Sequence, residues 1–151
     1  MVSVDQLVSP TPGLIAQMTG FITKKRYKYA TVYVDQASGL GYVYMQKTSS
    51  AEEILESKRA FENHAGTCGV IVEAYHTDSG TFKAHAWVDE CRRSRQALTF
   101  AGAGAHHANG KAERCICKLQ DMGRMMLIPR KSKMAKGNRG VPLAVCTATC
   151  K

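Results

Sequence analysis

Hydrophobic and β-branched residues recur in short runs over the first half of the chain. Three such runs come first, at residues 2–8, 29–35 and 40–46. Turn formers follow the first two runs, which predicts an antiparallel meander of three strands. Two further short strands are predicted at residues 69–75 and 98–100, with a turn over residues 76–80 after the first of them.

Apolar residues at helical spacing mark a helix over residues 51–64. Ser50 and Glu53 have the spacing of a capping box and predict where this helix begins. The periodicity also separates a buried stripe from an exposed face. The stripe consists of Ile54, Leu55, the Lys58 stem, Phe61 and Ala65, and the exposed face of Glu52, Glu56, Arg59 and Glu62.

Two more helices are predicted in the second half of the chain. Residues 82–95 form the first, with Phe82 and Trp87 on its core side. The second covers residues 112–128, after a mobile loop at 101–105, and Asn109 is its candidate cap. Its predicted buried stripe is Ala112, Cys115, Ile116, Leu119, Met122 and Met126.

Length and composition fit one globular domain with a basic extension. The 151 residues carry a net charge of +9, and no apolar run approaches the roughly 18 residues of a membrane span. Six basic and no acidic residues lie within 130–151, which leaves the rest of the chain with a charge of only +3. We therefore expect a core domain over residues 1–129 and a disordered basic tail over 130–151. No signal peptide is recognised, so secretion is not expected.

Six cysteines raise the question of a metal site. Cys115 and Cys117 could join Cys146 and Cys150 as four zinc ligands, but helical geometry turns residues two apart in different directions. Core packing for Cys115 and free thiols throughout are the favoured interpretation. Cys68 and Cys91 are expected to be buried small hydrophobes.

Three acidic residues stand in otherwise apolar or small-residue surroundings. Asp5 lies inside the first predicted strand, Asp78 in the turn after the fourth, and Glu113 in the first turn of the last helix. Hard cations such as Mg²⁺ are held by a few carboxylates, and a pair of ions about 3.5–4 Å apart catalyses in-line phosphoryl transfer. Each acid also has an ordinary explanation, because carboxylates complement helix N-termini and Asp organises turns.

Four local strings add a resemblance to a known family. In order they are residues 4–10 (VDQLVSP), 33–39 (YVDQASG), 76–80 (HTDSG) and 106–114 (HHANGKAER). Together they resemble the integrases of copia-type LTR retrotransposons over about residues 2–129. The step of 35 positions from Asp78 to Glu113 is also close to the family's D,D-35-E spacing.

The resemblance implies both a fold and an activity. The fold is α/β and RNase H-like, with a five-stranded mixed sheet of three antiparallel and two parallel strands and helices on both faces. Members of this family trim element DNA ends and join them to a target duplex, with two Mg²⁺ or Mn²⁺ ions held by three acids once DNA is bound. On this chain those catalytic and metal-binding acids are Asp5, Asp78 and Glu113. The family works in the nucleus as multimers, which implies a homo-oligomer, DNA partners and no membrane.

Asp35 is the rival for the first acid, because its string is also typical of the family. We favour Asp5, since the family's first acid lies on the first strand. Asp35 is expected to organise the turn that follows it through its side chain.

Departures from the family pattern keep two further interpretations open. Ser79 and Ala108 replace an Asn and a Gln, and Cys117 stands where the family places a basic residue facing DNA. The family's flanking domains are also not recognised, which suggests a truncated or decayed fragment. The chain could then be a non-catalytic nucleic-acid-binding remnant, or a fragment unable to fold alone. The remaining candidate DNA contacts are Asn109, Lys111, Arg114 and Lys118.

Overall fold

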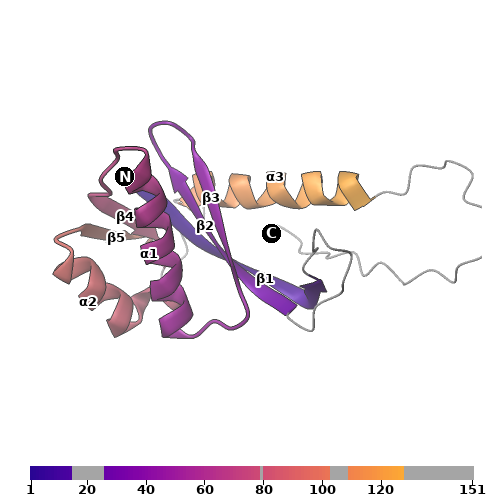
Figure 1. Ribbon diagram of the computed structural model, residues 1–151, viewed down its shortest axis with the longest axis horizontal. Helices are drawn as coiled ribbons and strands as arrows, with labels where there is room; N and C mark the ends of the chain where they lie inside the picture. The colour runs from indigo at the N-terminus through magenta and orange to yellow at the C-terminus, as the bar shows by residue number, and fades with distance from the viewer. Residues whose placement is uncertain (15–25, 79, 103–108, 128–151) are drawn as a thin grey trace, which may run out of the picture.

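Five strands form one mixed sheet in the order β3-β2-β1-β4-β5. The computed structural model describes residues 1–14, 26–78, 80–102 and 109–127 (Figure 1). Antiparallel pairing joins β1, β2 and β3, and parallel pairing joins β1 to β4 and β4 to β5. The strands are β1 (Val2–Leu14), β2 (Arg26–Asp35), β3 (Gly41–Gln46), β4 (Ala74–Thr77) and β5 (Ala97–Phe100). The predicted fold class is therefore confirmed.

Helices cover both faces of this sheet. They are α1 (Ala51–Thr67), a short 3-10 turn η1 (Thr81–Lys83), α2 (His85–Arg93) and α3 (Gly110–Leu127). α1 and α2 share a core cluster on one face, whereas α3 packs against β1 and β2 on the other. Figure 1 shows α1 and α2 beside β4 and β5, and α3 running away from the sheet on the right.

The largest differences from the predicted strand bounds are in β1 and β4. β1 was expected to end before Pro10, but it continues to Leu14 with a register shift between Val8 and Gly13. Prolines lack the amide that a regular ladder needs, and the irregular segment is where they fall. The fourth strand was expected at 69–75 but covers Ala74–Thr77, and Ile71 in the preceding segment is 87% exposed. An apolar run alone does not show whether a neighbouring strand is there to pair with it.

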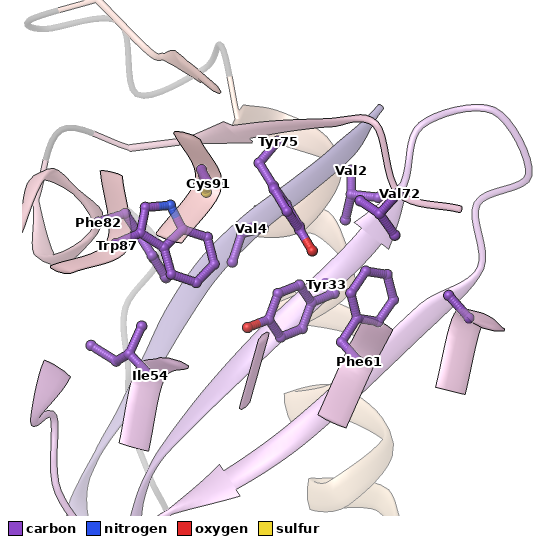
Figure 2. Packing of buried hydrophobic residues seen from close by; sticks show 11 residues of the cluster. Val2, Val4, Tyr33, Ile54, Phe61, Val72, Tyr75, Phe82, Trp87 and Cys91 are labelled. Carbon is purple, nitrogen blue, oxygen red and sulfur yellow. The ribbon is translucent and has the colours of Figure 1, made fainter. Parts of the chain in front are cut away.

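The α1/α2 side holds the larger core, which Figure 2 shows from close by. The Tyr33 and Phe61 rings are stacked with centroids 4.5 Å apart, and the Trp87 ring meets Tyr75 and Phe82 edge-on at 5.5 and 5.1 Å. The core positions predicted for Phe82 and Trp87 are confirmed. Burial of Cys91 is also confirmed, whereas Cys68 is exposed at the end of α1, so that prediction was wrong.

The predicted capping box is half formed. The Glu53 amide donates to the Ser50 hydroxyl at 3.3 Å, as expected for the N-cap. The Glu53 carboxylate does not reach back to Ser50, and instead accepts from the Lys47 and Thr48 amides at 2.9 and 3.0 Å. It therefore fastens the connection from β3 to the helix rather than the cap itself.

Glu62 was predicted on the exposed face of α1, and that prediction was wrong. Its Oε1 accepts from Lys58 Nζ at 2.8 Å, the Tyr75 hydroxyl at 2.9 Å and Gln96 Nε2 at 2.5 Å. Lys58 itself is fully buried, ammonium included. Burial raises the pKa of Glu62, but the three hydrogen bonds and the Lys58 charge together lower it by more. The pKa of Glu62 therefore lies below its ordinary value.

The apolar stripe of α3 is buried only over its first turns. Ala112 and Ile116 pack with Val32 and Val34 of β2, whereas Met122 is 49% exposed. Leu119 is exposed as well, which contradicts the prediction of one continuous buried stripe. The reason is geometric, because the helix is longer than the part of the sheet it covers (Figure 1).

Candidate functional site

Strand alternation directs Asp5 toward the α3 side of the sheet. Val2 and Val4 of β1 belong to the core under α1 and α2, and Leu7 packs against the core under α3. Successive side chains of a strand point to opposite faces, so Asp5 shares the face of Leu7. Its partner across β2 is Val32, which also belongs to the α3 cluster.

The parallel pairing of β1 with β4 sets Asp78 beside Asp5. Val4 pairs with Thr77, and one further step along both strands reaches Asp5 and Asp78. The Asp78 carboxylate accepts from the Gly80 amide at 3.2 Å, which fixes the start of the turn. A Cβ at position 80 would lie 3.1 Å from Asp78 Oδ2, so glycine gives this carboxylate its room.

Glu113 occupies the first turn of α3, and this turn is tied to β1. Asn109 Nδ2 donates to the Val4 carbonyl at 2.9 Å, and Asn109 is 2% exposed. Its Oδ1 has no hydrogen-bond partner among the described residues, so Asn109 is not the side-chain cap that was predicted. It instead docks the helix start next to Asp5.

The surroundings of Asp5 include the charges of the other two acids. Burial raises this pKa from 3.8 to about 6, the Gln6 amide opposes the rise with a 2.8 Å hydrogen bond, and the charges of Asp78 and Glu113 add to it. The fold thus brings Asp78 and Glu113 within electrostatic reach of Asp5. Carboxylate oxygens are the donors that hard divalent cations prefer. Within residues 1–14, 26–78, 80–102 and 109–127, however, no three His, Cys, Asp or Glu side chains already form a metal-binding group.

Asp35 has the turn role that was predicted for it. Its Oδ2 accepts from both the amide and the hydroxyl of Ser38 at 2.8 Å, and these bonds lower its pKa. The terminal ammonium of Met1 lies 3.9 Å from Oδ1. The Asp35 carboxylate thus stabilises the turn between β2 and β3 through Ser38. This role agrees with the preference for Asp5 as the first acid.

The candidate DNA contacts differ in their surroundings. Lys111, Arg114 and Lys118 are exposed on α3, but Lys111 Nζ donates to the Gln36 carbonyl and Arg114 Nε to the Gly110 carbonyl at 3.0 Å. Gln36 was not predicted, and no local pattern pointed to it, because its partners are remote in sequence. Ser79, Ala108, most of the predicted loop and the tail 130–151 lie outside the described residues.

The remaining sequence hypotheses concern cysteine. Cys68, Cys91 and Cys115 carry free thiols, as expected, and Cys115 packs against the α3 cluster. Cys146 and Cys150 lie outside the described residues, so the disfavoured zinc arrangement is not tested.

Comparison with solved structures identifies the fold. The catalytic core domain of BIV integrase superimposes with a TM-score of 0.56 at 17% identity, over 80% of this chain and 66% of that one. This is the fold of retroviral integrase catalytic cores. A simian T-cell lymphotropic virus intasome, solved in complex with a PP2A regulatory subunit, gives a TM-score of 0.59 at 16% identity, over 85% of this chain and 43% of that one. The chain thus spans less than two thirds of either integrase chain.

The sequence matches no protein-family model and no curated protein. Among the described helices of this integrase-core fold, none has the length and apolar character needed to cross a membrane.

Replacing Asp5 by Asn is expected to stabilise the fold at neutral pH in the absence of divalent metal. A folded-state pKa of about 6 lies above the ordinary 3.8, so the folded chain binds this proton more tightly and loses that stability as the pH rises through about 6. Asn carries no charge to desolvate, and its gain at about pH 8 is of order 2 kcal/mol. Urea unfolding of both chains at about pH 4 and about pH 8 measures this.

Asp35→Asn is the matched control. Its carboxylate has a lowered pKa and accepts two hydrogen bonds, so the same exchange is expected to destabilise the chain at neutral pH. A loss of stability for Asp5→Asn at about pH 8 would contradict the raised pKa of Asp5.

Proposed function

We propose that the chain is the catalytic core of a divalent-metal-dependent polynucleotidyl transferase that cuts and joins DNA, derived from a copia-type retrotransposon integrase. The observation that supports this proposal is the electrostatic influence of Asp78 and Glu113 on Asp5, from three separate parts of an integrase-core fold. Residues 1–129 form the proposed core, and residues 130–151 a basic extension.

The proposed metal ligands are the three carboxylates, with Mg²⁺ or Mn²⁺ as the resident cation and two ions present once DNA is bound. Their oxygen donors match the preference of these cations. Such a pair of ions supplies activation of the attacking oxygen and stabilisation of the leaving oxygen in an in-line displacement. Asn109 holds the Glu113-bearing turn against β1, and Gly80 leaves room for Asp78.

DNA is the proposed partner, both as element ends and as target duplex. Lys118 and Arg114 are exposed on the helix that carries Glu113, where cationic side chains can contact phosphates. Lys111 has three ammonium donors, of which one is used by Gln36, so it can contribute as well. Asn109 was also a candidate, but its side chain is only 2% exposed and so offers DNA little surface in this structure. Assembly as a homo-oligomer and action in the nucleus belong to the same proposal.

Metal binding tests this proposal directly. Calorimetric titration of the purified full chain with Mg²⁺ or Mn²⁺ is expected to show binding, and Asp78→Asn is expected to weaken it by about tenfold or more, because a coordinating carboxylate is lost. Circular dichroism of both chains confirms that they are folded. A folded wild-type chain without any divalent-metal binding would refute the proposed catalytic site.

A second candidate function is a non-catalytic nucleic-acid-binding remnant. Two observations favour it. Among the described residues, no three His, Cys, Asp or Glu side chains form a metal-binding group, and Cys117 stands where the integrase resemblance implies a basic residue facing DNA. The two candidates differ in one result: the remnant binds DNA with the same affinity whether or not divalent metal is present, and it cleaves nothing.

Removal of residues 130–151 is expected to weaken DNA binding and to flatten its salt dependence. These residues carry six basic and no acidic side chains, and each phosphate contact adds to the slope of log affinity against log salt. Titrations of labelled DNA at several salt concentrations give both slopes. Identical slopes for the two chains would show that the tail makes no phosphate contacts.

A further inference from the structure

Gln36 lies in the turn between β2 and β3 and is bonded to two elements that carry proposed metal ligands. Its side-chain Nε2 donates to the Ser3 hydroxyl of β1 at 2.8 Å. Its main-chain carbonyl accepts from Lys111 Nζ of α3. Its amide donates to the Met1 carbonyl at 2.9 Å, which keeps the turn beside the start of β1. Gln36 is therefore a bridge between β1 and the first turn of α3.

The two ends of this bridge lie close to the carboxylates. Ser3 is two residues before Asp5 on the same face of β1, and Lys111 is two residues before Glu113 in the same helical turn. Asn109 supplies a second tie, from the residue before α3 to the Val4 carbonyl. With two ties, the first turn of α3 is fixed in both position and rotation relative to Asp5.

We propose that Gln36 and Lys111 are positioning residues that set the distance from Glu113 to Asp5 and thereby the affinity of the carboxylate site for divalent cations. This inference rests on the function proposed above, since it assigns a role toward the same metal site. Mg²⁺ demands near-ideal octahedral geometry, so a helix turn that can drift holds it poorly. Outer contacts that orient metal ligands commonly change metal affinity by about 10- to 100-fold when removed.

The charge of Lys111 makes the proposal sharply testable. Lys111→Met removes a positive charge near a cation site, and by Coulomb's law that change alone would tighten cation binding. Loss of the bridge has the opposite effect, because Glu113 is no longer held in place. Gln36→Leu removes the bond to Ser3 without any change of charge, and Lys111→Met removes the bond to the Gln36 carbonyl. The two variants therefore have in common only that each breaks one end of the bridge.

The experiment is calorimetric titration of the full chain and its variants with Mn²⁺ alone, with circular dichroism as a check on folding. Lys111→Met and Gln36→Leu are each expected to bind Mn²⁺ about tenfold more weakly. Lys111→Arg keeps a donor for the Gln36 carbonyl and is expected to stay within about threefold of the wild type. Lys47→Met, an exposed lysine in the connection from β3 to α1, controls for net charge and is expected to change nothing.

Three outcomes are informative. Unchanged or tighter Mn²⁺ binding by Lys111→Met, with a wild type that binds, overturns the bridge and leaves the proposed function intact. No Mn²⁺ binding by the folded wild type overturns the proposed function and the bridge with it. If Lys111 serves only as a phosphate contact, Lys111→Met reduces the salt slope of metal-free DNA binding by about one and leaves Mn²⁺ affinity unchanged, which also overturns the bridge.

Discussion

Glu113→Gln is expected to abolish metal-dependent DNA cleavage while the chain remains folded. The substitution keeps the size of the side chain and its place in the first turn of α3 but removes the negative charge of a proposed metal ligand. Metal-ion catalysis contributes several kcal/mol of transition-state stabilisation, and 1.36 kcal/mol corresponds to a factor of ten, so the rate should fall by about a thousandfold or more. Cleavage of a labelled duplex in Mg²⁺ or Mn²⁺ is the measurement.

Asp35→Asn is the control for this result, because Asp35 was the rival for the first acid. Its side chain is engaged with Ser38 in the turn after β2, so its replacement should leave cleavage within a few-fold when assayed well below the melting temperature. Cleavage that survives in Glu113→Gln would remove Glu113 from the site. Cleavage lost in Asp35→Asn but kept in Asp5→Asn would mean that Asp35, and not Asp5, is the first acid of the site.

The three candidate acids were selected from the sequence by their apolar or small-residue surroundings and by the resemblance to integrase strings, whereas local rules predict only single features around them. Period-two alternation places Asp5 and Val4 on opposite faces of the sheet. The hydrogen bond from the Ser38 amide to Asp35 follows from the spacing of three residues that is common in turns. The order of strands and helices likewise follows from periodicity and turn formers. What the local pattern could not give is the parallel register that sets Asp78 beside Asp5.

The missed features depend on contacts between residues remote in sequence. Gln36 is unremarkable in its own turn and gains its place only through Ser3 and Lys111. Asn109 resembles a helix cap in sequence, yet its amide is used by Val4, more than a hundred positions away. Met122 has the right spacing for a buried stripe but lies beyond the sheet that would cover it. Periodicity in the sequence identifies the apolar face of a helix or strand, but it does not show which element packs against that face.

Glu62→Ala is expected to lower the free energy of unfolding by about 3–5 kcal/mol, because it leaves a buried charge without its partner. Lys58 is fully buried, and Glu62 lies 2.8 Å from its ammonium. The Tyr75 hydroxyl donates to the same oxygen and loses its acceptor too, whereas Gln96 Nε2 keeps the Val72 carbonyl at 3.0 Å. Since small domains are stable by about 5–15 kcal/mol in total, this single change should leave the chain close to unfolding. Urea denaturation at neutral pH measures it.

Lys58→Met separates a buried charge from ordinary packing in this network. Without Lys58, Glu62 keeps its bonds to Tyr75 and Gln96 and is 26% exposed to solvent, so the loss should be smaller than for Glu62→Ala. Asn63→Ala, on the exposed side of α1, should change stability by less than about 0.5 kcal/mol. Met keeps most of the apolar stem of Lys58, so a larger loss for Lys58→Met than for Glu62→Ala would mean that the ammonium holds α1 to β4 through contacts other than Glu62. In that case the contact between the Lys58 ammonium and the Tyr75 ring, 5.5 Å from its centroid, would be the interaction to examine next.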